Sequence, residues 1–211
     1  MLFAKSMLNE WMNSELLTEE WLSTAGEQYR TATPFPHIQI QDFLKEEQLE
    51  AIEEALSNHQ FEHKESDLFS LAQTPALNTL ADPVLDSYLA FLNSTEFREW
   101  MHALTGVMTT PGLLDAFGAI YMDTDYLLPH DDQLDDRKIA YILYLTSLTQ
   151  EQGGALALYT DENGHPAEVV KRYPPQRNAL NVFTVTDTSW HEVEEVTADT
   201  HRVSIGGWLR G

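Results

Sequence analysis

Three side chains in the second half of the chain are of the types that bind a transition metal. His130 and Asp132 are separated by one residue in the segment YLLPHDD, and His191 follows in a later apolar run. On a β-strand, positions two apart share a face, so His130 and Asp132 would point together while Asp131 would point away. Two histidines and one carboxylate make a facial triad that suits Fe(II) and leaves coordination positions open. Taken alone, the His-x-Asp pair also fits two exposed residues in an acidic turn.

An arginine in the last apolar segment could bind an anion close to such a metal. Arg202 lies in the run HRVSIGGW, and arginine is rarely buried without a partner. Its planar guanidinium suits a carboxylate in a bidentate pair, although an ion pair with one of the many acidic side chains is the alternative. Tyr121 and Tyr144 lie on the two candidate strands that flank the His-x-Asp strand. Their hydroxyls could donate to a carboxylate, or their rings could simply pack in the core.

The elements that must position these residues fall into two halves. The first 110 residues are expected to be mainly helical, because apolar residues recur at helical spacing in DFLKEEQLEAIEEAL (42–56), with Asp42 as the N-cap. Residues 83–105 predict two more helical segments, divided near Asn93. This half would support a sheet that is formed mainly by the rest of the chain.

From Gly112 onward, short apolar runs alternate with turn residues, which is typical of β-strands. Eight short strands in roughly a hundred residues predict a double-sheet jelly roll. We therefore expect an α+β fold and a single domain over 1–211, with 1–110 as helical support and 111–211 as the jelly-roll core with the metal site. The candidate strands are 34–40, 113–122, 126–132, 138–146, 155–160, 168–172, 180–186, 190–196 and 201–209.

The composition narrows the partners and the compartment. A formal net charge of −22 over 211 residues disfavours nucleic acid and anionic membrane; it would attract a basic protein or serve solubility alone. The absence of cysteine excludes disulfides, Cys-ligated metals and thiol nucleophiles. The sequence has no signal-peptide pattern and no run as apolar as a membrane span. We expect a soluble cytoplasmic protein, with the nucleus open if the source is eukaryotic.

The order His130-x-Asp132, His191 and Arg202 on predicted jelly-roll strands resembles the Fe(II)/2-oxoglutarate-dependent oxygenases. Several short sequence segments are similar to those of the prolyl hydroxylases within that family. In particular, the chain resembles the subfamily that hydroxylates a prolyl residue of a small-subunit ribosomal protein. The segments on which the resemblance rests are PFPHIQIQDFL (34–44), FEHKESDLFSLAQT (61–74), DYLLPHDD (125–132), RKIAYILYLT (137–146), GGALALY (153–159) and RVSIGGW (202–208).

The resemblance implies a reaction and a role for each candidate residue. The cofactor would be Fe(II), with 2-oxoglutarate as cosubstrate, O2 as oxidant and ascorbate in support. The substrate would be a prolyl residue in a basic protein segment, expected to come from the small ribosomal subunit. The implied roles are metal binding by His130, Asp132 and His191, anchoring of the distal 2-oxoglutarate carboxylate by Arg202 and Tyr144, cosubstrate contact by Tyr121, and lining of the pocket by Trp208.

Other functions stay open at the level of sequence. Eukaryotic members of the subfamily carry a second, non-catalytic jelly roll, so the ribosomal substrate does not transfer automatically, and residues 61–80 are expected to form the substrate-facing edge. The same chemistry could act on another translation protein, a small molecule or an alkylated nucleobase. A non-catalytic sensor with this fold would be free to lose one of His130, Asp132, His191 and Arg202, and all four are intact. A cupin-like protein with another metal, or an isomerase, would not need both Arg202 and Tyr144.

Overall fold

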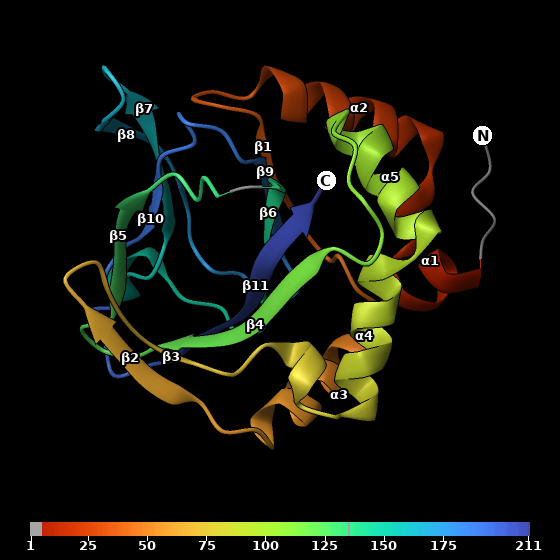
Figure 1. Ribbon diagram of the computed structural model, residues 1–211, viewed down its shortest axis with the longest axis horizontal. Helices are drawn as coiled ribbons and strands as arrows, with labels where there is room; N and C mark the ends of the chain where they lie inside the picture. The colour runs from red at the N-terminus through yellow and green to blue at the C-terminus, as the bar shows by residue number, and fades with distance from the viewer. Residues whose placement is uncertain (1–5, 135) are drawn as a thin grey trace.

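The computed structural model describes residues 6–134 and 136–211, and it places a layer of helices against a strongly curved antiparallel sheet (Figure 1). The helices lie together on one side and the sheet closes on itself on the other. The α-helices are α1 (Ser6–Trp11), α2 (Glu19–Thr31), α3 (Glu46–Ser57), α4 (Pro83–Asn93) and α5 (Thr95–Thr105); short 3-10 turns are η1 (Ser14–Leu17), η2 (Leu77–Thr79) and η3 (Gln150–Gln152).

The strands form one sheet in the order β1-β9-β6-β11-β4-β3-β5-β10-β7-β8, and β2 pairs with β3 beside this path. Each of the eight strands predicted after Gly112 is present, and the expected jelly roll is confirmed. The strands are β1 (His37–Ile40), β2 (Glu62–Ser66), β3 (Phe69–Gln73), β4 (Leu114–Tyr121), β5 (Tyr126–His130), β6 (Arg137–Tyr144), β7 (Leu156–Asp161), β8 (Pro166–Tyr173), β9 (Leu180–Thr184), β10 (His191–Val193) and β11 (Arg202–Arg210).

The helices start and stop where local hydrogen bonding dictates. The Asp82 side chain accepts from the backbone of Val84 and Leu85 at the start of α4, and the Ser94 side chain does the same for Phe97 at the start of α5. Such side-chain caps satisfy backbone donors that the first turn leaves unpaired. The predicted division near Asn93 is therefore confirmed. None of the described helices has the length and apolar character that crossing a membrane would demand.

A large hydrophobic cluster joins the helices to the outer face of the sheet. Trp100 of α5 is completely buried, stacks on Trp21 with ring centroids 5.9 Å apart, and donates its indole N–H to the Leu16 carbonyl at 2.9 Å. Leu143 of β6 and Leu209 of β11 belong to the same cluster. The helical layer thereby holds the central strands in place and leaves the opposite face of the sheet to line a cavity.

Two local expectations for the first half were wrong. Asp42 is not the cap of α3: the helix begins at Glu46 after Lys45, and Asp42 has a left-handed φ of 48° before the buried residues Phe43 and Leu44. Residues 62–73 form the β2–β3 hairpin and not helical support. All of β2 is exposed, so its sequence has no apolar alternation to reveal a strand.

The central strand β11 makes a close approach to β4 that a side chain would prevent. A Cβ added at Gly207 would lie 1.9 Å from the Asp115 backbone oxygen, whereas one at the neighbouring Gly206 meets no atom closer than 3.5 Å. Forced overpacking of this kind costs about 1–3 kcal/mol. We expect Gly207→Ala to lower the melting temperature by about 2–12 °C and Gly206→Ala to change it little, as measured by calorimetry. Equal melting temperatures for the two variants would contradict this account of β11.

Candidate metal centre

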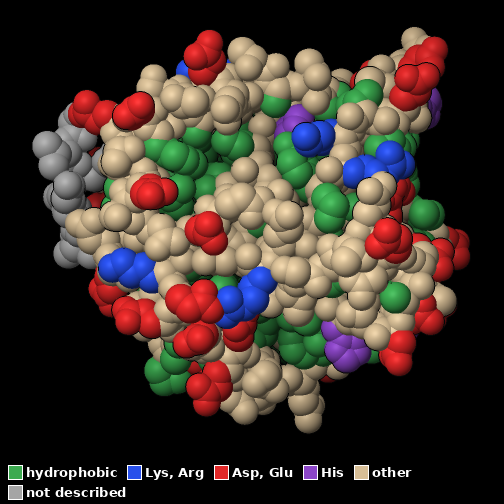
Figure 2. Space-filling model, turned by 180° about the vertical axis from the view of Figure 1, so that it is seen from behind, with side chains coloured by type: hydrophobic (Ala, Val, Ile, Leu, Met, Phe, Trp, Pro, Cys, Tyr) green, Lys and Arg blue, Asp and Glu red, His purple; other side chains and the backbone are tan. Residues whose placement is uncertain are grey.

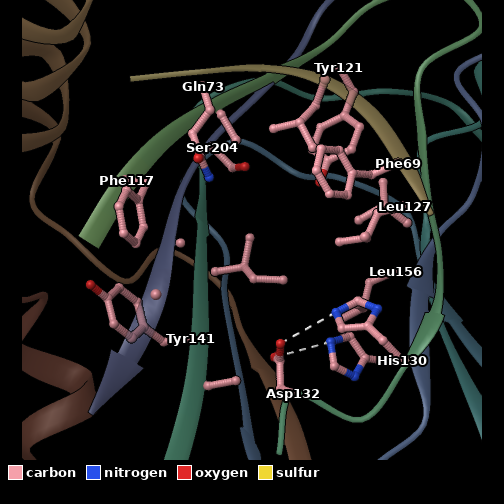
Figure 3. Close-up of a pocket in the computed structure, with 18 of the residues that line it drawn as sticks. Phe69, Gln73, Phe117, Tyr121, Leu127, His130, Asp132, Tyr141, Leu156 and Ser204 are labelled. Carbon is pink, nitrogen blue, oxygen red and sulfur yellow. Dashed lines mark ion pairs between the residues drawn. The ribbon is translucent and has the colours of Figure 1, made fainter. Parts of the chain in front are cut away.

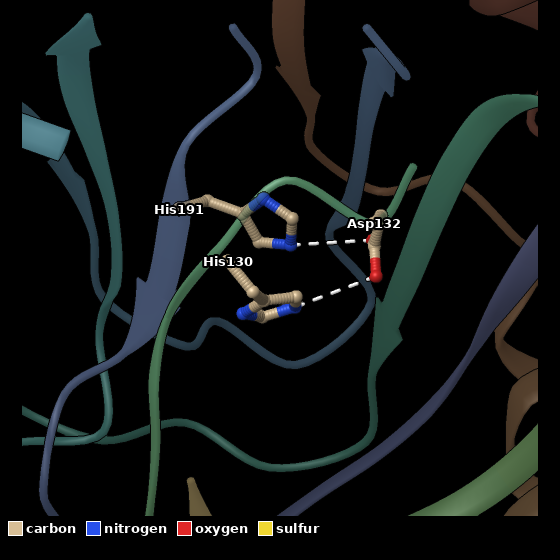
Figure 4. Close-up of side chains that lie close together, drawn as sticks. All are labelled: His130, Asp132 and His191. Atoms are coloured by element: carbon tan, nitrogen blue, oxygen red, sulfur yellow. Dashed lines mark ion pairs between the residues drawn. The ribbon is translucent and has the colours of Figure 1, made fainter. Parts of the chain in front are cut away.

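The structure brings His130, Asp132 and His191 together at one end of a cavity inside the jelly roll (Figure 4). One ligand atom of each lies within 4.8 Å of the others. His130 Nε2 is 3.4 Å from Asp132 Oδ1, and His191 Nε2 is 3.3 Å from Asp132 Oδ2. The two histidines come from paired strands, since His130 ends β5 and lies opposite His191 on β10. The antiparallel register of β5 and β10 therefore sets the distance between the two imidazoles.

Asp132 reaches this position by a different route from the one that the strand pattern predicts. Strand β5 ends at His130, and Asp132 has a left-handed backbone with φ of 62°. Aspartate adopts this conformation more readily than most residues. Its carboxylate turns back toward the two imidazoles, whereas the Asp131 carboxylate accepts from the backbone N–H of Gln133 at 3.0 Å. The expected choice of Asp132 over Asp131 agrees with this geometry, but a local turn, not strand alternation, produces it.

Backbone carbonyls orient both imidazoles. His130 Nδ1 lies 2.9 Å from the Leu128 oxygen, and His191 Nδ1 lies 2.8 Å from the Ser189 oxygen. A carbonyl can only accept, so each Nδ1 donates its proton to a carbonyl, and each Nε2 faces the Asp132 carboxylate. Two imidazole nitrogens and one carboxylate then lie close together, and this arrangement favours the binding of a cation. Outer partners of this kind fix the rings of metal-binding histidines, so these residues fit a metal.

Trp208 and Arg137 surround the Asp132 carboxylate from the other side. The Trp208 indole N–H donates to Asp132 Oδ2 at 2.9 Å. The Arg137 guanidinium lies over the Trp208 ring at 3.3 Å from its centroid, and one of its nitrogens is 3.7 Å from Asp132 Oδ1. Trp208 lines the pocket, as its resemblance to a pocket aromatic suggested. Sequence analysis missed Arg137 as a site residue, although it is the first residue of the segment RKIAYILYL, on which the resemblance partly depends.

The charges at this end stabilise an ionised Asp132. Burial disfavours the carboxylate, but the charge of His191 and hydrogen bonds from both imidazoles outweigh burial and hold the pKa of Asp132 well below its usual range. Burial also disfavours a charged His130, but the hydrogen bond and charge of Asp132 prevail and raise the pKa of His130. Asp132 is therefore an anionic ligand at neutral pH. A metal must compete with a proton for His130 as the pH falls.

Arg202 lies at the other end of the same cavity, with only 1% of its surface exposed. Its guanidinium donates to the Gly154 carbonyl at 2.9 Å, to the Ser204 hydroxyl at 3.3 Å and to the Tyr144 hydroxyl at 3.3 Å. No carboxylate in the described part of the chain lies within ion-pair distance of Arg202. The alternative of an internal ion pair therefore does not hold. A buried cation without a counterion is costly, so this end of the cavity favours an anionic ligand.

Two tyrosines flank Arg202, but not in the way expected. Tyr121 lies directly opposite Arg202 on β4, and Tyr144 lies opposite Ser204 on β6. The tyrosine strands thus flank β11 in the sheet and not the His-x-Asp strand, which pairs with β3 and β10. The guanidinium carbon is 4.8 Å and 4.9 Å from the centroids of the Tyr121 and Tyr144 rings. Burial raises the pKa of Tyr121 to about 12 against the influence of Arg202, so its phenol stays neutral.

Tyr144 supports Arg202 from behind, since it is fully buried and is not among the residues that line the cavity. Its hydroxyl also accepts from the Asn181 amide at 3.0 Å. With two donors directed at its oxygen, the hydroxyl keeps its own proton free to donate. Asn181 was missed, although an asparagine inside the apolar run ALNVF was a signal that a buried polar contact exists.

Apolar walls separate the two polar ends of the cavity, which has a volume of about 350 Å³. Figure 3 shows His130 and Asp132 at one end and Ser204 with Gln73 toward the other. Residues of the β2–β3 hairpin, within the region 61–80 that we expect to face the substrate, line the cavity. The apolar side chains between the ends include Phe69, Leu71, Phe117, Leu127, Leu156 and Trp208.

Metal binding is the first test of this geometry. Asp132→Ala removes the anionic donor, and we expect Mn(II) affinity to fall by more than about 100-fold, because even the loss of an outer partner costs about 10–100-fold. Asp131→Ala is the matched control, since its carboxylate bonds only the local backbone, and its affinity should stay at the parent value. Isothermal titration calorimetry measures both. Parent-like affinity in Asp132→Ala would remove Asp132 from the proposed ligands.

Comparison with known proteins supports the assignment of this cavity as a site for a metal and an anionic ligand. Residues 117–210 match the family model described as the 2OG-Fe(II) oxygenase superfamily. The chain is 38% identical over 220 residues to the mouse Prolyl 3-hydroxylase OGFOD1 and 34% identical over 213 residues to the Xenopus laevis protein of the same name. These matches include 94% and 97% of this chain, but the chain spans only about two fifths of those relatives, 39% and 41%.

A solved structure shows the same fold at lower sequence identity. The Pseudomonas putida prolyl-4-hydroxylase superposes with a TM-score of 0.67 at 20% identity, over 90% of this chain and 98% of that one. At that identity the likeness concerns the fold alone. The family model and the curated relatives, however, confirm the resemblance that the motifs around His130 and Arg202 suggested. Residues 117–210 are therefore a domain of the 2OG-Fe(II) oxygenase superfamily.

Proposed function

We propose that this chain is the catalytic part of a 2-oxoglutarate-dependent prolyl hydroxylase that acts on a basic segment of a small-subunit ribosomal protein. The observation that carries the proposal is the cavity itself, with converging metal donors at one end and the unpaired, buried Arg202 at the other. In the proposed reaction a prolyl C–H bond becomes C–OH. One atom of O2 enters the product, and the other enters succinate as 2-oxoglutarate loses CO2.

The metal end would hold Fe(II) through His130 Nε2, His191 Nε2 and the Asp132 carboxylate. When bound, Fe(II) with 2-oxoglutarate supplies the oxygen activation, which no side chain of this pocket can provide. The protein contributes orientation: carbonyl partners fix both imidazoles, and the Trp208 N–H directs one oxygen of Asp132. This preorganisation holds the three donors together beside the cavity, where they would bind the metal.

The anion end would hold the distal carboxylate of 2-oxoglutarate. Arg202 provides the charge, while the Tyr144 hydroxyl holds its guanidinium from behind and the Ser204 hydroxyl holds it from the cavity wall. Tyr121 lines the cavity beside it and can donate its neutral phenol proton. A dicarboxylic acid with one end at the metal and the other at Arg202 matches the separation of charges in the cavity, because each end of the molecule meets its complement.

The apolar walls would receive the pyrrolidine ring of a prolyl residue. Phe69, Leu127 and Trp208 present ring and aliphatic surface to the cavity. A saturated ring without a hydrogen-bond donor fits such a surface better than a polar side chain does. The same walls exclude water from the reacting centre, which strengthens the interactions of the charged groups there.

The exterior charge supports a basic protein partner. The net charge is −22, and Figure 2 shows acidic side chains spread over one face of the molecule with few lysines and arginines. The relatives bear the name prolyl 3-hydroxylase, and the 3-carbon is accordingly the position that we propose. A chain without cysteine that modifies ribosomal proteins would work in the reducing cytoplasm, with ascorbate as the supporting reductant.

The role of Arg202 predicts a selective loss of cosubstrate binding. Arg202→Leu leaves the distal carboxylate unpaired in a desolvated pocket, which costs on the order of 2–5 kcal/mol and corresponds to a loss of at least about 30-fold in affinity. Calorimetric titration of the Mn(II)-loaded protein with 2-oxoglutarate measures this. Arg210→Leu, on the same strand but paired with Asp115 away from the cavity, is the control and should bind normally. Unchanged binding in Arg202→Leu would rule out the role.

The substrate is tested by direct oxidation of peptides. The protein is incubated with Fe(II), 2-oxoglutarate and ascorbate together with a peptide set that covers the small-subunit ribosomal proteins. We expect one prolyl peptide to gain a single oxygen by mass spectrometry, with matched succinate formation, and Asp132→Ala to show neither. Succinate formation with a small metabolite but with no peptide would reject the prolyl substrate and keep the oxygenase chemistry.

A further inference from the structure

Strand β2 is an open edge at the rim of the cavity. It pairs with β3 and, among the described strands, with no other, and all five of its residues are exposed. Lys64 of β2 lines the cavity and donates to the Gln73 side chain at 2.8 Å, so this edge borders the mouth. An unpaired strand edge presents backbone donors and acceptors to any extended segment that reaches it.

The direction of the unpaired backbone groups follows from the hairpin register. On the far side of β3, the Leu68 carbonyl accepts from β5 and the Thr74 N–H donates to the Gly118 carbonyl within β4. Backbone groups alternate along a strand, so the odd-numbered residues of β3 bond to the even-numbered residues of β2 that oppose them. His63 and Glu65 therefore turn their N–H and C=O groups toward the open edge.

We propose that an extended segment of the prolyl polypeptide substrate adds to β2 as a further strand, with the target proline on the cavity side of that strand. This rests on the proposed function and extends it to the mode of substrate recognition. The backbone of the substrate would bond to His63 and Glu65, and its side chains would alternate between the cavity and solvent. Specificity would then come from register as well as from side-chain pockets.

Two independent requirements select the same register. The reaction needs the proline on the face that Lys64 shares, because Lys64 lines the cavity, and residues directly opposite each other share a face. An added residue opposite Lys64 has its backbone nitrogen turned away from β2, since only His63 and Glu65 bond outward. Proline lacks an N–H and is tolerated in a strand only where no ladder bond is needed. The cavity-facing position is therefore the one that proline can occupy.

The charges along the edge favour a basic segment. Glu62, Glu65 and Asp67 are exposed on β2 and its turn, and Lys64 is engaged by Gln73. Lysine or arginine next to the proline would oppose Glu65 across the new pair, an arrangement that stabilises neighbouring strands. Strand β8 is another open edge of the sheet, but none of its residues lines the cavity, so it serves as a control.

The absence of cysteine allows the register to be read directly by cross-linking. Glu65→Cys is prepared with Mn(II) and 2-oxoglutarate bound, and is mixed under oxidising conditions with synthetic peptides of lysine, threonine and one central proline. A single cysteine is moved one position at a time along the peptide. Disulfides form only between closely opposed residues. The matched control is Val170→Cys on the exposed edge of β8, where Val170 is 46% exposed.

We expect the disulfide yield on Glu65→Cys to alternate, with peptide cysteines adjacent to the proline exceeding the next positions on the order of tenfold, because only opposed positions meet the distance limit. Val170→Cys should give uniformly low yields. Equal yields at neighbouring positions, or the same alternation on Val170→Cys, would overturn strand addition.

A second measurement uses the peptide backbone. N-methylation of the residue next to the proline should weaken binding to the Mn(II)- and 2-oxoglutarate-loaded protein by about threefold to tenfold, because it removes one ladder bond. Methylation of the following residue should not. If peptides are hydroxylated but neither pattern appears, strand addition fails and the proposed function stands. If no peptide binds or is hydroxylated, both fail.

Discussion

A buried positive charge that no carboxylate of the described residues pairs with is the feature on which the pocket depends. Arg202 lies on the middle strand of the sheet, and its contacts are a carbonyl, two hydroxyls and two ring faces. These contacts orient the guanidinium but do not neutralise it. The tyrosine strands on either side of β11, and the buried Asn181 behind them, are arranged to hold the cation where only a ligand can meet it.

The other end of the cavity carries a buried negative charge. Asp132 is ionised in a largely buried place, and the Nε2 atoms of His130 and His191 face it. One end therefore favours a cation and the other an anion, within a single apolar enclosure. Strand β11 connects them, since it carries Arg202 at its start and Trp208, the donor to Asp132, near its end. The close packing at Gly207 matters because it fixes this strand against its neighbour.

The sequence predicted secondary structure well where burial produces a regular pattern of apolar residues. Most strands after Gly112 are short apolar runs divided by turn residues, and this pattern was enough to predict them. The His130 and His191 pair also followed, because both end up on strands. Asp132 lies beside the two histidines, but strand alternation does not explain why, since its position depends on a left-handed turn that residue spacing does not encode.

The remaining features depend on tertiary contacts that no local pattern contains. The β2–β3 hairpin is exposed on both faces of β2, so it has no hydrophobic signature. The neighbours of Tyr121 and Tyr144 were assigned from chain order, but a jelly roll places β11, the last strand in sequence, between them. The sequence shows Arg137 as a basic residue in an apolar segment. Its position over the Trp208 ring, however, follows only from the pairing of β6 with β11.

The position of β3 between the two walls of the barrel bears on how molecules enter. Phe69 and Ser70 pair with β5, while Ala72 and Gln73 pair with β4. A hairpin anchored to both walls cannot swing outward as a hinged flap without breaking ladder hydrogen bonds to one wall or the other. Entry is then through a permanently formed opening, and the rate of association is set by diffusion and charge attraction, not by a gating motion of the hairpin.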